Sequence, residues 1–316
     1  MTRVLVTGAT GFIGPAVVEE LQRAGHQVRV ALRRYMPPLP DIEYTITGGI
    51  GPTTDWRPAL AGVRAVVHLA ARAHVADGDP SSLARFREVN SLGTKRLAEA
   101  AADAGVRRFV FLSSVKAMAE RSPPGRPLTE ADPAHPEDAY GMSKREGEMA
   151  VVAVGERSGM ETAILRAPLV YGPGVKGNFL RLLRLVDRGI PLPFGAVANR
   201  RSLVARINLA RALRLCVERN EAAGRIFLVA DGEDLSTPEL VRRLARALGR
   251  PARLVAVPPS LLRATASLFG RTGEMARLTG DLAVDGSLLR DRLGWRPAAS
   301  VDEALAETAA WYRTSR

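Results

Sequence analysis

Short apolar segments bounded by turn residues recur along the chain, and helical patterns separate most of them. The helical patterns at residues 12–25 and 91–105 carry apolar residues at positions i, i+3 and i+4, and each ends in glycine. Strands that alternate with helices predict an α/β fold, a doubly wound parallel sheet with helices on both faces. The expected strands are residues 4–8, 27–32, 65–70, 108–114, 162–172 and 225–231.

The alternation of strand and helix patterns changes after residue 172. Residues 173–203 contain one helical pattern and a segment rich in proline and glycine, and short helices follow residue 232. We therefore expect two domains. Residues 1–172 form the sheet domain, to which residues 204–231 return, and residues 173–203 with 232–316 form a smaller domain.

The charge balance bears on which partners are possible. The 316 residues carry a net charge of +12, but the arginines are spread along the chain and no nucleic-acid-binding motif accompanies them. Small phosphate-bearing ligands account for part of this excess. With one cysteine, Cys216, no long apolar run and no signal-peptide pattern, we expect a cytoplasmic protein that neither inserts into membranes nor binds nucleic acid.

A glycine motif follows the first predicted strand and opens the first predicted helix. Gly8, Gly11 and Gly14 are spaced G-x-x-G-x-x-G. The first glycine permits a tight turn, the second lets the backbone approach a pyrophosphate, and the third lets the helix pack closely on the strand. This context predicts a Rossmann-type dinucleotide site.

The end of the second predicted strand should select between NAD and NADP. An acidic residue there would bind the ribose hydroxyls of NAD, but this strand ends with Leu32, Arg33 and Arg34. Arginine can pair with the 2′-phosphate of NADP. The sequence therefore favours NADP(H), and NAD(H) remains possible if both arginines are only solvated surface charges.

Three residues suggest acid–base chemistry beside that cofactor. Only four of the 45 basic residues are lysines, and one of them, Lys144, stands four residues after Tyr140 on a predicted helix. We expect the ammonium to lower the pKa of the Tyr140 phenol, which could then serve as acid and base. Ser114, at the end of a predicted strand, would hydrogen-bond and orient the substrate oxygen. No histidine or cysteine spacing suggests a metal site.

These motifs, in this order and spacing, resemble the extended short-chain dehydrogenase/reductases along nearly the whole chain. Within that family the sequence is most similar to enzymes of nucleotide-linked sugars, of the UDP-glucose 4-epimerase type. The resemblance implies that Ser114, Tyr140 and Lys144 are catalytic. It also implies substrate contacts at Ser113, Ser114, Tyr140, Asn178 and Arg201. The cofactor contacts expected from the motifs and the resemblance are Gly8, Thr10, Gly11, Phe12, Ile13, Gly14, Arg33, Arg34, Leu69, Ala70, Ala71, Asn90, Tyr140 and Lys144.

The sequence departs from related patterns at informative positions. Sugar 4,6-dehydratases follow the catalytic serine or threonine with Asp-Glu, whereas Val115 and Lys116 follow Ser114 here, which argues against dehydration. The epimerases usually carry Asp after the second strand, where this chain has Leu32 and Arg33.

The main hypothesis is an NADPH-linked reductase of a 4-keto sugar on a nucleotide, with UDP as the favoured nucleotide and Tyr140 as proton donor. The first alternative is a UDP-sugar 4-epimerase that retains NAD. The second is a reductase of a small non-sugar ketone, and a cofactor-binding protein without catalysis is a further class. Relatives often form homodimers through a four-helix bundle, which residues 91–104 and 140–157 could supply.

Overall fold

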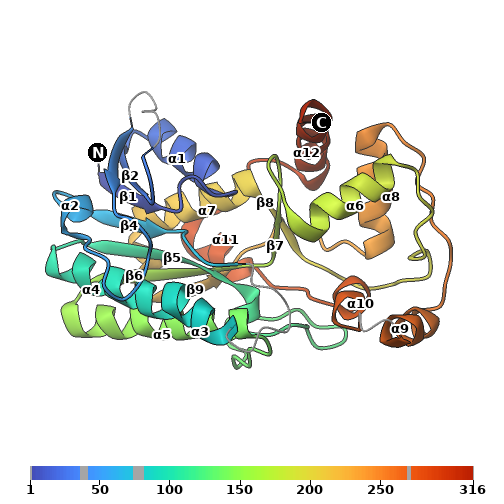
Figure 1. Ribbon diagram of the computed structural model, residues 1–316, viewed down its shortest axis with the longest axis horizontal. Coiled ribbons are helices and arrows are strands. Elements are labelled where there is room, and N and C mark those ends of the chain that lie inside the picture. Colours follow the sequence, from blue (N-terminus) through green and yellow to red (C-terminus); the bar gives the residue numbers. More distant parts are fainter. Residues whose placement is uncertain (1, 36–41, 74–81, 269–271, 316) are drawn as a thin grey trace.

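A computed structural model describes residues 2–35, 42–73, 82–268 and 272–315. Its main feature is a seven-stranded sheet in the order β3-β2-β1-β4-β5-β6-β9, in which all neighbouring strands are parallel (Figure 1). The strands are β1 (Arg3–Thr7), β2 (Gln27–Leu32), β3 (Glu43–Ile46), β4 (Ala65–His68), β5 (Arg108–Ser114), β6 (Glu161–Ala167) and β9 (Arg225–Leu228). The predicted α/β class and its doubly wound parallel sheet are confirmed.

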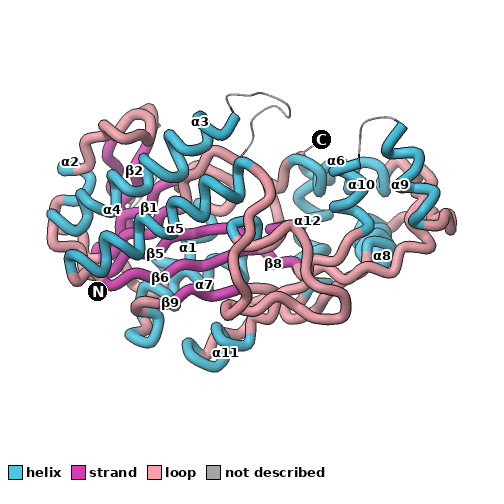
Figure 2. Tube along the Cα trace, turned by 90° about the horizontal axis from the view of Figure 1, so that it is seen from below, coloured by secondary structure: helices cyan, strands magenta, loops and turns pink. Residues whose placement is uncertain are grey.

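Helices cover both faces of this sheet. One face packs against α1 (Gly14–Arg23), α7 (Arg206–Glu218) and α11 (Ser287–Leu293). The other packs against α2 (Arg57–Leu60), α4 (Thr94–Asp103) and α5 (Ala139–Ser158), with α3 (Ser82–Arg87) beside α5 (Figure 2). The central strands are buried on both sides, which explains their nearly continuous apolar sequence.

A second region lies beyond the carboxyl ends of the strands (Figure 1). It contains a two-stranded parallel sheet of β7 (Leu169–Tyr171) and β8 (Leu203–Ala205). Around this sheet are α6 (Gly177–Asp187), α8 (Thr237–Leu248), α9 (Pro259–Leu268), α10 (Thr272–Thr279) and α12 (Val301–Thr314). A separate apolar core joins most of these elements. The domain boundaries at 172, 203 and 231 remain our prediction.

The structure refines three of the expected strands. The segment 162–172 forms two strands that separate at Pro168, which has no backbone N–H to give to a ladder. The segments 65–70 and 225–231 stop being strand at His68 and Leu228.

The described residues also contain short helices that are not α-helical. They are the π-helix η1 (Glu88–Gly93) and the 3₁₀ turns η2 (Val115–Ala117) and η3 (Asn220–Ala222). Within the described ranges no helix is long and apolar enough to cross a membrane.

Candidate active site

The glycine motif forms a backbone cradle between β1 and α1. Gly8 has φ of +73°, and a Cβ atom on it would lie 2.7 Å from the backbone nitrogen of Ala70. A Cβ on Gly14 would lie 2.3 Å from the carbonyl oxygen of Ala9, so α1 can pack on the turn only without a side chain there. Thr10 and Gly11 are exposed at the turn. These residues fit a dinucleotide, because side-chain-free backbone and a helix N-terminus meet at one point.

His68, the last residue of β4, fixes the part of the cradle that follows this strand. Its imidazole is fully buried and hydrogen-bonds Thr7 Oγ1 at 2.6 Å and Thr94 Oγ1 at 3.0 Å. Thr7 Oγ1 also accepts the backbone N–H of Ala70 at 3.3 Å. Burial, with a smaller contribution from the positive charge of Lys144, lowers the pKa of His68 to about 3, so the ring is neutral. His68 thereby holds the residues that follow β4 against the glycine turn, with Leu69 and Ala70 half-buried and Ala71 exposed.

Asn90 occupies the π-helix η1, an irregularity that often marks functional sites. The side chain is fully buried; its Oδ1 accepts the backbone N–H of Arg72 at 2.8 Å, and its Nδ2 donates to Ser143 Oγ at 3.0 Å. Asn90 therefore links the segment after β4 to α5. A Cβ on Gly147 would lie 2.4 Å from the carbonyl oxygen of Asn90, which shows how closely α5 approaches η1.

Ser114 and Tyr140 meet at the carboxyl end of β5. Both side chains are half-buried, and a side-chain hydrogen bond joins them. The Tyr140 ring packs edge-on against Phe86 of α3, with 5.8 Å between the ring centroids. Strand ends at this edge of a doubly wound sheet are where ligands bind.

Lys144 lies one helical turn after Tyr140 and is 2% exposed. Its Nζ donates to the carbonyl oxygen of Leu112 at 2.8 Å and lies 3.9 Å from the centroid of the Phe111 ring. Burial lowers the pKa of Lys144 to about 7, although the Glu148 carboxylate acts in the opposite direction. Because the Lys144 ammonium is buried and hydrogen-bonded, its position is fixed, which suits a hydrogen-bond donor at a binding site.

The prediction that the protein itself lowers the pKa of Tyr140 is wrong. Burial and then the Asp138 carboxylate raise the pKa of Tyr140 to about 12, and only the hydrogen bond with Ser114 lowers it. The ammonium of Lys144 instead faces a carbonyl of β5 and the Phe111 ring. Helical spacing placed the two residues on one face of α5, but it did not place their charged atoms together.

Ser113 points into a buried polar cluster. Its hydroxyl donates to Glu148 Oε1 at 2.6 Å, and Glu148 is fully buried. Arg166 of β6 holds the same carboxylate with two hydrogen bonds, of 2.9 and 2.7 Å. The Ser113 hydroxyl is therefore engaged with Glu148, farther along α5, whereas Ser114 bonds Tyr140 at the start of that helix.

Sequence reasoning missed a charged group beside Ser114. Lys116 Nζ donates to Asp138 Oδ2 at 2.5 Å and to Glu120 Oε1 at 2.6 Å. Asp138 also caps α5, because its Oδ1 accepts the backbone N–H of Gly141 at 2.6 Å. The signal in the sequence was an Asp directly before the helical pattern that carries Tyr140.

The expected substrate-phosphate residues lie in the second region. Asn178 is exposed in the first turn of α6 and makes no cap, since Lys176 occupies the N-cap position. Arg201 is half-buried and donates to the carbonyl oxygens of Arg277 at 2.6 Å and Gly280 at 3.2 Å. Burial lowers the pKa of Arg201, which Glu120 and Asp281 oppose.

Arg33 and Arg34 are both exposed after β2. Beside them, a mostly apolar cavity of about 210 Å³ opens between α1, β2 and β3, and Thr10, Leu32 and Tyr44 are among its lining residues. The cavity borders the glycine turn.

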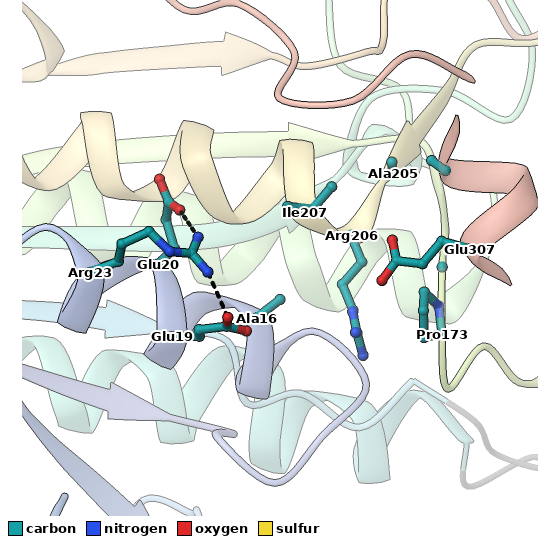
Figure 3. Close-up of a pocket in the computed structure, with 11 residues that line it drawn as sticks. Ala16, Glu19, Glu20, Arg23, Pro173, Ala205, Arg206, Ile207 and Glu307 are labelled. Atoms are coloured by element: carbon teal, nitrogen blue, oxygen red, sulfur yellow. Dashed lines mark hydrogen bonds and ion pairs between the residues drawn. The ribbon is translucent and has the colours of Figure 1, made fainter. Parts of the chain in front are cut away.

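A second, smaller cavity of about 60 Å³ lies where α1, α7 and α12 meet (Figure 3). The Arg206 side chain projects beside it between Glu307 and the α1 helix, and its guanidinium lies 5.9 Å from the Phe12 ring centroid. Phe12 and Ile13 are half-buried. Neither Ser114 nor Tyr140 lines this cavity, which lies between α1 and the second region and is not the reaction centre.

The described residues contain no group of three or more histidine, cysteine, aspartate or glutamate side chains that could hold a metal ion. The parallel sheet, the glycine cradle, the Ser114–Tyr140 hydrogen bond and Lys144 one turn farther along α5 are features of an enzyme of the extended short-chain dehydrogenase/reductase type.

Comparisons with known proteins agree with that class. Residues 4–230 match the NAD dependent epimerase/dehydratase family. A UDP-glucose 4-epimerase from Vibrio cholerae is 43% identical over 309 residues, which cover 97% of this chain and 94% of the relative. The chain belongs to the NAD dependent epimerase/dehydratase family.

Solved structures show the same architecture. The UDP-glucose 4-epimerase from Thermotoga maritima with UDP-glucose superposes with a TM-score of 0.79 at 26% identity, covering 99% of both chains. A short-chain dehydrogenase/reductase superfamily protein from Agrobacterium tumefaciens with bound NAD gives a TM-score of 0.78 at 26% identity, covering 99% of this chain and 98% of that one.

Proposed function

We propose that this protein is a UDP-sugar 4-epimerase that retains NAD(H) through the reaction. The observation that carries the proposal is the Ser114–Tyr140 pair at the end of β5, beside a glycine cradle, in a chain that matches the Vibrio cholerae epimerase along almost its whole length. This was the first alternative from sequence, and the relatives support it better than the main hypothesis of a reductase.

The cofactor supplies the hydride acceptor and donor. The glycine cradle at Gly8 and Gly14 would hold its pyrophosphate, and Asn90 and the turn after β4 would lie along it. Lys144, whose Nζ already donates to the backbone, would add a donor toward its ribose. The apolar cavity beside Leu32 and Tyr44 is a candidate site for its adenine end.

Tyr140 would move the proton of the reaction. Its oxygen takes the proton of the sugar's C4 hydroxyl as that carbon is oxidised, and returns the proton when the carbon is reduced from the opposite face. Ser114 would donate a hydrogen bond to the same C4 oxygen and hold it near Tyr140. Since the protein's own groups raise the pKa of Tyr140 to about 12, the base form depends on positive charge that arrives with an oxidised nicotinamide.

Asn178 and Arg201 are the proposed contacts to the substrate diphosphate. Arg201 uses one of its guanidinium nitrogens on backbone carbonyls, which fixes the group in place, and an arginine has further donors for phosphate oxygens. We do not include Ser113, because its hydroxyl is engaged by Glu148.

The test is epimerisation without added cofactor. Purified protein is incubated with UDP-glucose, and UDP-galactose is measured together with the nucleotide that copurifies. We expect bound NAD(H), turnover without added cofactor, and a loss of at least about a hundredfold in Tyr140→Phe. Tyr312→Phe in α12 is the control. It also removes a tyrosine hydroxyl that makes a hydrogen bond, here to Asp187, and it should keep full activity.

The reductase remains a second candidate because Arg33 and Arg34 are exposed at the cofactor-selecting end of β2. It requires exchangeable NADPH and consumption of that NADPH by a UDP-linked 4-keto sugar. Protein purified without nucleotide, with NADPH oxidation and no epimerisation, would replace the first proposal by this one. If Arg201→Ala leaves the activity unchanged, the substrate is instead a small ketone without phosphates.

We also propose a homodimer through α4 and α5. These helices pack against each other, and Leu92, Met142 and Met149 remain exposed on η1 and α5. Exposed large apolar side chains grouped on one helical layer suit a subunit interface.

A further inference from the structure

Lys116 connects the segment that carries Ser114 to the helix that carries Tyr140. Its backbone N–H donates to Ser114 Oγ at 3.2 Å, and its ammonium donates to Asp138 Oδ2 at 2.5 Å. One residue therefore contacts the Ser114 hydroxyl through its backbone and the N-cap of α5 through its side chain.

The two segments also touch directly at a glycine. A Cβ on Gly141 would lie 2.3 Å from the carbonyl oxygen of Lys116, so the first turn of α5 lies against the backbone of η2. Gly141 donates its N–H to Asp138 Oδ1, which leaves Oδ2 for the ammonium. Asp138 thus serves both as the helix cap and as the partner of Lys116.

Among the described residues, the charged groups on the elements around Tyr140 include Asp138 at the N-cap of α5, Lys144 one turn along α5, and Lys116 of η2 with its partner Glu120. The Ser114 hydroxyl, at the end of β5, is hydrogen-bonded to Tyr140, whereas the Lys144 ammonium is turned toward Leu112 and Phe111. From α3, Phe86 is the contact, while Arg87 is paired with Glu146 farther along α5. In this set, Asp138 is the group whose negative charge raises the pKa of Tyr140.

We propose that the Lys116–Asp138 ion pair is a positioning device that holds Ser114 in register with Tyr140 and screens Tyr140 from the Asp138 carboxylate. The proposal rests on the proposed role of Tyr140 as the proton-transfer group. In support, the Asp138 carboxylate raises the pKa of Tyr140. Burial is the largest single influence on the pKa of Asp138 and acts to raise it, but the hydrogen bonds from Lys116 and Gly141 and the positive charge of Lys116 together hold this pKa below its usual value. The carboxylate is thus ionised and needs the ammonium beside it.

The test uses substitutions that remove one charge at a time. Asp138→Asn keeps a good helix cap but removes the negative charge, so the acid limb of the pH–rate profile should move to lower pH by about one unit. Lys116→Met leaves the carboxylate unscreened, so the same limb should move to higher pH. Lys116→Arg should restore the wild-type limb, and the double variant Lys116→Met/Asp138→Asn should return toward it.

A role in structure alone would lower the rate in both single variants without moving their limbs in opposite directions. Shifts in the same direction, or no shift in either variant, would overturn the proposal. The control is Lys95→Met on α4, which also removes a lysine from an ion pair, with Glu99, and should leave the profile unchanged.

A second readout needs no substrate. Tyrosinate absorbance in the near ultraviolet is followed after a rapid jump to alkaline pH, and the signal of the matching Tyr140→Phe protein is subtracted. Tyr140 should ionise at lower pH in Asp138→Asn than in the wild type, and no earlier than the wild type in Lys116→Met. If these shifts occur while UDP-glucose is not epimerised, the proposed function fails and the ion-pair assignment stands; epimerisation without the shifts gives the reverse result.

Discussion

The Nζ atom of Lys144 lies 3.9 Å from the centroid of the Phe111 ring, in a position where the side chain is almost completely buried. The cation–π contact and one hydrogen bond to a carbonyl oxygen compensate only part of the lost hydration of an ammonium. Lys144 therefore makes the folded protein less stable than an apolar residue at the same position would.

Replacing Lys144 by Met should stabilise the fold while it lowers activity. The pKa of folded Lys144, about 7, lies below its ordinary value of 10.5, so between these pH values the unfolded chain binds more protons than the folded one. The cost is complete below pH 7 and disappears as the pH rises toward 10.5. At pH 7 we expect a gain of roughly 1–3 kcal/mol in unfolding free energy, measured by urea denaturation. Lys95→Met is the control. A loss of stability in Lys144→Met that is equal at pH 7 and pH 10 would contradict the expectation.

His68 should make the fold sensitive to mild acid. The pKa of folded His68 is about 3 against an ordinary 6.5, so as the pH falls through this window the unfolded chain takes up the proton first. The stability contribution is complete above pH 6.5 and is lost toward pH 3, by about 2 kcal/mol at pH 5. His68→Gln should have a lower stability at pH 7 but a flatter dependence on pH. His135→Gln, at an exposed histidine, should keep the wild-type slope in urea unfolding between pH 7 and pH 5.

Gly8→Ala should weaken cofactor binding, and backbone strain alone should not account for this loss. The new methyl group would lie 2.7 Å from the backbone nitrogen of Ala70, inside the cradle. Gly25→Ala imposes a similar strain, at φ of +82°, with nothing within 4 Å of the methyl group. Gly25→Ala should lose about 1 kcal/mol of stability, and Gly8→Ala should lose more because its methyl group also meets the backbone of Ala70. In titration calorimetry only Gly8→Ala should weaken NAD binding, by at least about tenfold, and equal weakening in the two proteins would show that the cradle is not the site.

The proposed dimer predicts a specific effect at Met149. This side chain is 58% exposed on α5, and glutamate there would place a charge in an apolar interface. Met149→Glu should shift the protein to monomers in light scattering coupled to size-exclusion chromatography. Leu268→Glu, at an 83% exposed leucine of α9, should leave the mass unchanged. A wild type that is already monomeric would exclude this interface.

Strands buried on both faces were predictable from the sequence, whereas two strands, β3 and β8, were not. β1, β4 and β5 are mostly apolar because helices cover both their sides. β3 is an edge strand with mostly exposed side chains, so its sequence carries no buried face to detect. β8 has only three residues, and a partner distant in sequence, β7, determines it.

The meeting of Ser114 and Tyr140 was predictable from the sequence, but the charges around these two residues were not. Ser114 and Tyr140 do meet, because a strand end and a helix start define their places. The direction of the Tyr140 pKa depends on burial and on Asp138, neither of which the Tyr-Lys spacing reveals. Likewise, the hydrogen bond from Ser113 to Glu148 depends on how α5 packs against β5, which the sequence around Ser113 does not reveal.

The burial of Lys144 also decides how the protein can be handled chemically. Among the four lysines, Lys95 and Lys176 are exposed, Lys116 is tied to two carboxylates, and Lys144 is enclosed. Amine-reactive dyes or resins will therefore attach mainly at Lys95 and Lys176, apart from the amino terminus. The rarity of lysine thus provides defined anchoring points for immobilising or fluorescently tagging the molecule while the amine beside Tyr140 stays unmodified.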